Sequence, residues 1–96
     1  MNDTLPGYTV LDGPPTIPDY LGLRREAGMS SKTEEQAAAG IGGAWAAIHA
    51  IHNESGDTVG MGRVIGDGGW YFHVIDMAVL PPHQGRGIGS AVLRAL

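Results

Sequence analysis

The sequence has 96 residues, of which 43% are hydrophobic and 17% charged, so it can bury one modest core and is not a disordered chain. Its formal net charge is −4 and it has no block of lysine or arginine, so nucleic acid is not an expected partner. The absence of cysteine excludes disulfides, thiolate metal sites and a cysteine acyl intermediate.

No targeting segment or membrane-spanning segment is expected. The N-terminus, Met1-Asn2-Asp3-Thr4, is acidic and leads to no apolar run, unlike a signal peptide. The longest uncharged stretch, residues 37–51, is shorter than the ~20 residues of a membrane helix and is interrupted by glycines. These features predict a cytoplasmic protein with no membrane partner.

The first half of the chain predicts one strand and two helices. Residues 8–11 are β-branched, aromatic or apolar and end at a Gly-Pro-Pro stop, which is typical of a short strand. Residues 16–27 predict a helix that has a proline near its start and a glycine after its end. Thr33 and Gln36 have the spacing of a capping box, which predicts a second helix over residues 33–43.

The second half predicts three strands joined by tight turns, followed by a helix. The strands are residues 44–52, 58–65 and 70–80, the turns are 53–56 and 66–69, and the helix is 87–96. The strand over 70–80 is expected to be the longest. We expect Trp45 and Trp70 to pack in the core or beneath a turn, because both rings are large and apolar.

Successive side chains of a strand point to opposite faces of the sheet, so the side chains of residues 70–80 would divide into two sets. The even positions from Trp70 to Leu80 would share one face, on which Asp76 is the polar exception. The odd positions from Tyr71 to Val79 would share the other face, on which His73 is the polar exception. Asp76 is expected to be structural, whereas His73 is either a packed, hydrogen-bonded histidine or a functional one.

Three alternating glycines follow this strand and open directly into the last helix. Backbone N–H groups at such a loop and at a helix N-terminus lack intrachain acceptors and can bind anions. Gly85, Gly87 and Gly89 have no Gly-Lys-Ser/Thr ending, so this is not a Walker loop, and Ser90 stands where a dinucleotide fingerprint needs glycine. A glycine-rich turn that only caps a structural helix is the alternative.

Gln84-Gly85-Arg86-Gly87-Ile88-Gly89 resembles the Gln/Arg-x-x-Gly-x-Gly/Ala signature of the GNAT family of N-acetyltransferases. The resemblance implies an α+β fold with a mixed, mostly antiparallel sheet and the order β-α-α-β-β-β-α. It also implies that residues 1–96 are a single partial domain, truncated before the family's last strands and helix.

The family resemblance implies acetyl-CoA as the cofactor and direct acetyl transfer to a primary amine. The cofactor residues it implies are Met77, Ala78, Val79, Gln84, Gly85, Arg86, Gly87, Ile88, Gly89 and Ser90. Among them, the backbone N–H of Val79 would stabilise the thioester oxygen, and Arg86 is either a phosphate contact or a solvated side chain. His73 would be the general base.

Arg24 and Met29 fall where the family's first helices wall the acceptor pocket; a helix surface and a linker methionine are the alternatives. His49 and His52 would lie on opposite faces of a strand, so no metal site is expected. His83 is expected to be exposed to solvent.

The implied strand neighbour of residues 70–80 does not occur in the sequence, so an exposed edge is expected. This edge predicts either a homo-oligomer or pairing with a complementary C-terminal segment. Two other functions remain open: a non-catalytic module that binds acyl-CoA, and a nucleotide-binding α/β domain of another kind.

Overall fold

The computed structural model describes residues 5–96; residues 1–4, where no signal peptide is expected, lie outside the described residues. Its elements, in chain order, are β1 (Tyr8–Asp12), α1 (Ile17–Glu26), α2 (Glu34–Gly42), β2 (Ala46–His52), β3 (Thr58–Gly66), β4 (Phe72–Val79), the 3-10 turn η1 (Pro81–His83) and α3 (Ile88–Ala95). The four strands form an antiparallel sheet of order β1-β2-β3-β4. The predicted α+β class and element order are confirmed.

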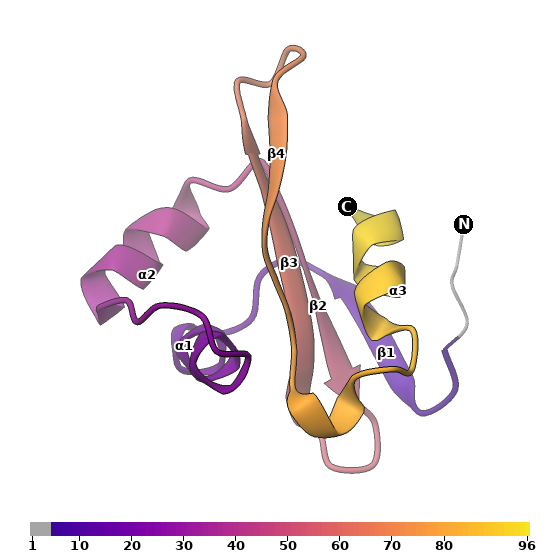
Figure 1. The fold of residues 1–96 in the computed structure, drawn as a ribbon. Coiled ribbons are helices and arrows are strands. Elements are labelled where there is room, and N and C mark those ends of the chain that lie inside the picture. Colours follow the sequence, from indigo (N-terminus) through magenta and orange to yellow (C-terminus); the bar gives the residue numbers. More distant parts are fainter. Residues whose placement is uncertain (1–4) are drawn as a thin grey trace.

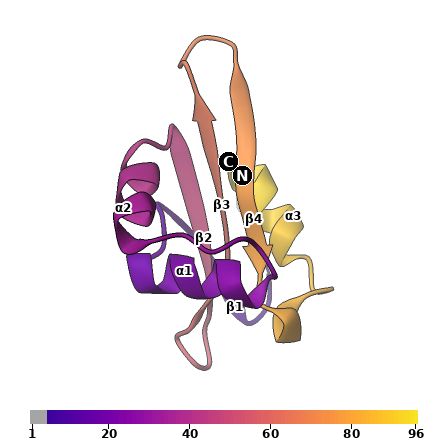
Figure 2. The same cartoon turned by 60° about the vertical axis from the view of Figure 1, so that its left-hand side comes forward.

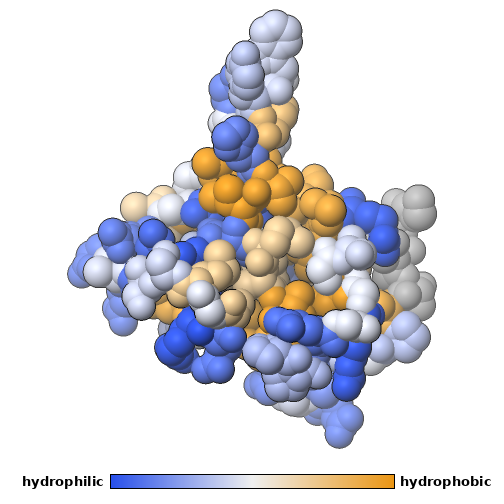
Figure 3. Space-filling model, in the orientation of Figure 1, coloured by the Kyte–Doolittle hydropathy of each residue, from blue (hydrophilic) through white to orange (hydrophobic). Residues whose placement is uncertain are grey.

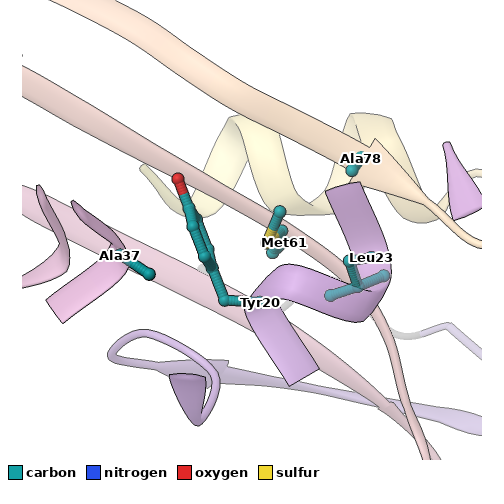
Figure 4. Packing of buried hydrophobic residues seen from close by; sticks show 5 residues of the cluster. All are labelled: Tyr20, Leu23, Ala37, Met61 and Ala78. Carbon is teal, nitrogen blue, oxygen red and sulfur yellow. The ribbon is translucent and has the colours of Figure 1, made fainter. Parts of the chain in front are cut away.

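The sheet separates two layers of helix, with α1 and α2 on one face and α3 on the other (Figures 1 and 2). The α1/α2 face holds one buried cluster, made of Tyr20, Leu23, Ala37, Met61 and Ala78 (Figure 4). The α3 face holds a second cluster, made of Ile48, Ala50, Val59, Ile88 and Val92. Each helix therefore buries its apolar stripe against one side of the same sheet.

Two glycines of β3 let α3 approach the sheet closely. A Cβ atom at Gly60 would lie 2.7 Å from Cγ2 of Ile88, and one at Gly62 would lie 2.9 Å from Cγ1 of Val92. Both distances are shorter than two carbon atoms tolerate, so only glycine permits this packing. Neither glycine was predicted from the sequence to have this role.

Capping side chains start both N-terminal helices. The hydroxyl of Thr16 accepts a hydrogen bond from the N–H of Asp19 at the start of α1. At α2, Thr33 and Gln36 form the predicted capping box, with reciprocal bonds of 2.9 and 3.1 Å. A cap of this kind contributes about 1 kcal/mol to helix stability.

The strand predicted over 70–80 starts later than expected. β4 begins at Phe72 and has 8 residues, whereas β3 has 9 and is longer. The cause is the carboxylate of Asp67, which accepts backbone N–H bonds from Gly69, Trp70 and Tyr71 and keeps them in the turn. The bond from Gly69, joined by those from Tyr71 and Trp70, holds the pKa of Asp67 below its ordinary value.

A β-bulge overturns the predicted face assignment of this strand. Ala78 pairs with Met61 and Ile75 with Arg63, so Asp76 and Met77 together oppose the single residue Gly62. One extra residue reverses the side chains that follow it.

The residues of β3 that pair with His73, Ile75 and Ala78 are two positions apart from one another, so they lie on one face of the sheet. His73, Ile75 and Ala78 therefore share the α1/α2 face. Met77 and Val79 instead pack on the α3 cluster, so the expected grouping of His73 with Met77 and Val79 is wrong.

The β3–β4 hairpin projects beyond the body of the molecule as an arm, with apolar residues gathered at its base (Figure 3). Trp70 is 82% exposed at its tip, so the expectation that this ring is buried is wrong. Trp45 is also exposed, but it packs against Phe72 and the turn at Gly68, as predicted for a ring beneath a turn. Within residues 5–96, no helix is both long enough and apolar enough to cross a membrane.

Candidate functional site

The predicted phosphate-binding segment forms the wall of an open hollow. The hollow measures ≈ 320 Å³ and lies where β4 ends, η1 turns and α3 begins. It is lined by Val79, His83, Gln84, Gly85, Gly87, Ile88, Gly89 and Ser90. Seven of the ten predicted cofactor residues therefore meet around one space, and among residues 5–96 no carboxylate lines it.

We call residues 84–90 the glycine loop, because two glycines give it its shape. Gly85 and Gly87 have φ angles of +78° and +86°, in the left-handed region that residues with a Cβ rarely adopt. Gly87 is the N-cap of α3 and offers no side chain to the helix. The N–H of Ala91 donates to the carbonyl of Gly87, so the N–H groups of the three residues before Ala91 have no acceptor one turn back.

Val79 presents its backbone groups at the open edge of β4. The N–H of Leu80 donates to the carbonyl of Val59 in β3 at 2.8 Å. Backbone groups alternate in direction along an antiparallel strand, so the N–H and C=O of Val79 point away from β3. Its carbonyl accepts a 3.0 Å bond from Nε2 of Gln84, which fastens the glycine loop to the strand end.

Tyr8, from the opposite end of the chain, supports the glycine loop. Its hydroxyl accepts a 3.1 Å bond from Nη1 of Arg86 and lies 2.7 Å from Nδ1 of His83. His83 is thus half-buried and bonded, and the expectation of a fully exposed side chain is wrong. Burial, together with the charges of His52 and Arg86, lowers the pKa of His83, which favours the neutral ring that accepts from the phenol.

Three predicted cofactor residues lie outside the hollow's lining. Arg86 is exposed, and its guanidinium reaches Tyr8. The side chain of Met77 packs on the α3 cluster, and Ala78 is buried on the opposite face of the sheet. Any contact of Met77 or Ala78 with a ligand at the open edge would therefore come from backbone atoms.

The buried charged cluster of the protein surrounds Asp76. The carboxylate accepts bonds of 2.6 Å from Tyr20 Oη, Arg24 Nη1 and Arg63 Nε. We call these four residues the carboxylate cluster. Burial alone would raise the pKa of Asp76, but the hydrogen bonds from Tyr20 and Arg63 and the charges of Arg63 and Arg24 outweigh it and lower the pKa. Asp76 is structural, as expected, but its partners are side chains from α1 and β3 rather than nearby backbone groups.

Arg24 is committed to this cluster and is not available to an acceptor. It is only 6% exposed, and its guanidinium also bonds to the carbonyl and hydroxyl of Ser30. The alternative interpretation of Arg24, as a residue of the helix surface, is therefore wrong. Met29 is half-buried and packs against the cluster of the α1/α2 face.

His73 lies far from Val79 along β4. The two residues are six positions apart in the strand, which is roughly 20 Å at the usual rise per residue. His73 is exposed, pairs with Ile65 in the arm, and is not the packed histidine that the sequence also allowed. His49 and His52 bond instead to Gly13 and Ser55, and residues 5–96 hold no group of three or more His, Cys, Asp or Glu suited to a metal.

Comparison with known proteins decides the family. The sequence model described as the acetyltransferase (GNAT) family matches residues 17–96. The chain belongs to the GNAT family. The resemblance first seen in the glycine loop is therefore confirmed, and it extends over α1, α2, the strands β2 to β4 and α3 of this GNAT chain.

Solved structures agree with the GNAT assignment. A probable acetyltransferase of unknown function from methicillin-resistant Staphylococcus aureus is 41% identical, with a TM-score of 0.84 over 92% of this chain and 65% of its own. A GNAT-family acetyltransferase from Streptococcus pneumoniae is 26% identical, with a TM-score of 0.77 over 92% of this chain and 64% of its own. The ribosomal-protein-S18-alanine N-acetyltransferase of Escherichia coli, at 19% identity and a TM-score of 0.76 over 92% of this chain and 56% of its own, shares the fold.

This GNAT chain spans about two thirds of the length of those first two relatives, 65% and 64%. A comparison with curated proteins found no match.

Proposed function

We propose that this GNAT chain binds acetyl-CoA at the glycine loop and transfers the acetyl group to a primary amine. The observation that supports the proposal most directly is the meeting of two donor sets at one hollow. One set is the N–H groups at the start of α3, which have no acceptor one turn back in the helix, and the other is the outward N–H of Val79.

The glycine loop fits a pyrophosphate. A Cβ at Gly85 would meet nothing within 4 Å, so the space over this residue is open, and the left-handed turn turns backbone N–H groups outward. The N-terminus of α3 adds a partial positive charge, and Arg86 adds a full one nearby. We assign the phosphate contacts to Gln84, Gly85, Gly87 and Ser90 and to the N–H groups of Ile88 and Gly89.

Val79 is proposed to stabilise the reacting carbonyl. When bound, the thioester supplies an acyl carbon that an amine can attack directly. A donor at the open edge of β4, fixed by the strand and by Gln84, is already oriented toward the oxygen that gains negative charge. Holding both reactants against one strand edge also supplies proximity.

A titration tests cofactor binding and separates the alternatives. Calorimetry with CoA, NAD and ATP should show binding of CoA at micromolar levels and weaker binding of the other two ligands. Preference for NAD or ATP would favour the nucleotide-binding alternative. CoA binding without thiol release, in the presence of a panel of amines and acetyl-CoA, would favour the non-catalytic acyl-CoA module.

The general base is proposed with a separate test, because His73 lies far from Val79. If His73 is the base, His73→Ala should lower the rate and remove a pH dependence near neutrality while CoA affinity stays unchanged. An unchanged pH–rate profile would exclude His73 from proton transfer. His49→Ala, in β2, is the matched control, since its ring is bonded to the carbonyl of Gly13.

We also propose that the open edge of β4 pairs with another segment, either in a second copy or in a complementary C-terminal piece. Phe72 and Val74 on this edge are 43% and 47% exposed, which is unusual for large apolar side chains in a sheet. Light scattering of the purified chain tests the proposal. A monodisperse monomer at high concentration would contradict self-association.

A further inference from the structure

Asp76 adopts a backbone conformation that needs an explanation. Its φ is +57°, and it is the one residue other than glycine with a positive φ within residues 5–96. It stands at the bulge position that usually carries a left-handed glycine, opposite Gly62. Such a conformation persists where the surroundings over-determine it.

The surroundings of Asp76 come from four parts of the fold. Tyr20 and Arg24 reach it from α1, and Arg63 reaches it from β3. Arg24 is itself held by the carbonyl of Ser30, in the segment between α1 and α2. Arg63 donates a 2.7 Å bond to the carbonyl of Gly40 in α2. One carboxylate therefore links β4 directly to α1 and β3, and through Arg24 and Arg63 to Ser30 and α2.

The cluster is more elaborate than packing requires. The side chains of Asp76, Arg24 and Arg63 are 7%, 8% and 14% exposed, and burying ions in this way costs desolvation that apolar side chains avoid. No buried side-chain nitrogen or oxygen among the described residues lacks a partner. Full satisfaction of every donor defines one geometry for the bulge.

The geometry of the bulge determines which way the next residues face. Because Asp76 and Met77 share one place in the ladder, Ala78 points into the α1/α2 core and Val79 packs toward α3. The same shift sets which backbone N–H groups point to β3 and which point to the open edge. Asp76 lies three residues before Val79 in the same strand, so a change of register at the bulge would change the direction of the Val79 N–H.

We propose that Asp76 is a positioning residue for acyl transfer: the carboxylate cluster locks the bulge and thereby aims the N–H of Val79 at the acyl site. The inference rests on the proposed function of Val79. It also means that the positions of α1 and α2 affect the direction of backbone N–H groups at the open edge of β4, because these helices supply Tyr20, Arg24 and the Gly40 carbonyl.

The test uses two variants and a matched control in the full chain, labelled with ¹⁵N. Asp76→Gly keeps the left-handed backbone accessible but removes the carboxylate, and Asp76→Asn keeps the shape but removes the charge. Asp67→Asn is the control, because that carboxylate also accepts several bonds in the same hairpin but lies in the turn away from the site. Amide shifts are recorded with CoA and with acetyl-CoA.

The expected result is a split between the glycine loop and Val79. In Asp76→Gly, CoA affinity should stay within about threefold of the parent, with loop amide shifts retained, while the Val79 amide no longer distinguishes acetyl-CoA from CoA. Asp76→Asn should show a partial loss, and Asp67→Asn should show none.

The outcomes separate the inference from the function on which it rests. A parent chain without loop shifts on CoA addition would refute the proposed function itself. Loop and Val79 responses retained together in Asp76→Gly would overturn the positioning role. Loss of the folded spectrum in both Asp76 variants would overturn it too, because the carboxylate would then serve folding rather than placement.

Discussion

The carboxylate cluster and the glycine loop flank the same end of β4 but are built by different means. The cluster is made of side chains from α1, β3 and β4, buried, ionised and bonded at 2.6 Å. The glycine loop is made of backbone, exposed, and shaped by left-handed glycines. The first holds a fixed geometry, and the second leaves N–H groups free for a ligand. A site for an anionic ligand thus benefits from a rigid region beside one with unused donors.

If this contrast is correct, removing the carboxylate should harm stability more than any change in the glycine loop. Asp76→Ala leaves two buried guanidinium groups without their carboxylate. It also places alanine at φ +57°, in the left-handed region that aspartate adopts more readily than alanine. The free energy of unfolding should fall by about 3–5 kcal/mol, measured by urea denaturation. Asp67→Ala, at the exposed turn, is the control. An equal loss in both variants would remove the distinction between the regions.

The glycine loop should respond in the opposite way, losing binding more than stability. Gly87→Val puts a β-branched side chain at φ +86° beside the proposed phosphate contacts. CoA affinity should fall at least tenfold, or about 1.4 kcal/mol, by calorimetry. Gly28→Val is matched for backbone strain, with φ +79° and no atom within 4 Å of the new Cβ, but it lies after α1. Comparable affinity loss in the control would contradict the loop assignment.

A smaller effect is expected from Tyr8, whose side chain extends from β1 and hydrogen-bonds to the glycine loop. Tyr8→Phe removes the hydroxyl shared by His83 and Arg86. Because one hydrogen-bonding group contributes about 1 kcal/mol, CoA affinity should weaken by about three- to tenfold. Thr9 lies next to Tyr8 in β1, and Thr9→Val removes its hydrogen bond to Asn53. This variant should leave the affinity for CoA unchanged. An unaltered Tyr8→Phe variant would show that the loop holds its own shape.

The weakest effect is expected in acid. The folded pKa of Asp76 is lowered, so the stability it contributes is present above its unfolded pKa of about 3.9 and is lost as pH falls through the folded value. The free energy of unfolding of the parent should therefore fall steeply as pH drops below about 4, and that of Asp76→Asn should depend less on pH in this range. Parallel curves for the two proteins would show that the carboxylate is not ionised in the folded cluster.

The order of elements was accessible from the sequence because each is encoded locally. The Thr33/Gln36 box marks the start of α2, and the alternating glycines mark the start of α3. Strand ends were less accessible: β4 starts at Phe72 because Asp67 holds the preceding residues in the turn. The face assignment failed because alternation assumes an unbroken ladder, and an aspartate that adopts φ +57° gives no signal of a bulge.

The sequence alone therefore determined the fold class, the element order and the glycine loop, since those depend on residues within a few positions of one another. Tertiary structure decided the bulge, the carboxylate cluster, the support of the loop by Tyr8 and the close packing of α3 on Gly60 and Gly62. These contacts join residues that are far apart in the sequence. Arg24 and Asp76 are 52 positions apart, and Tyr8 and Arg86 are 78 positions apart. Such pairs form only when folding brings distant residues together, which no local pattern records, and the Arg24–Asp76 pair is in addition removed from water.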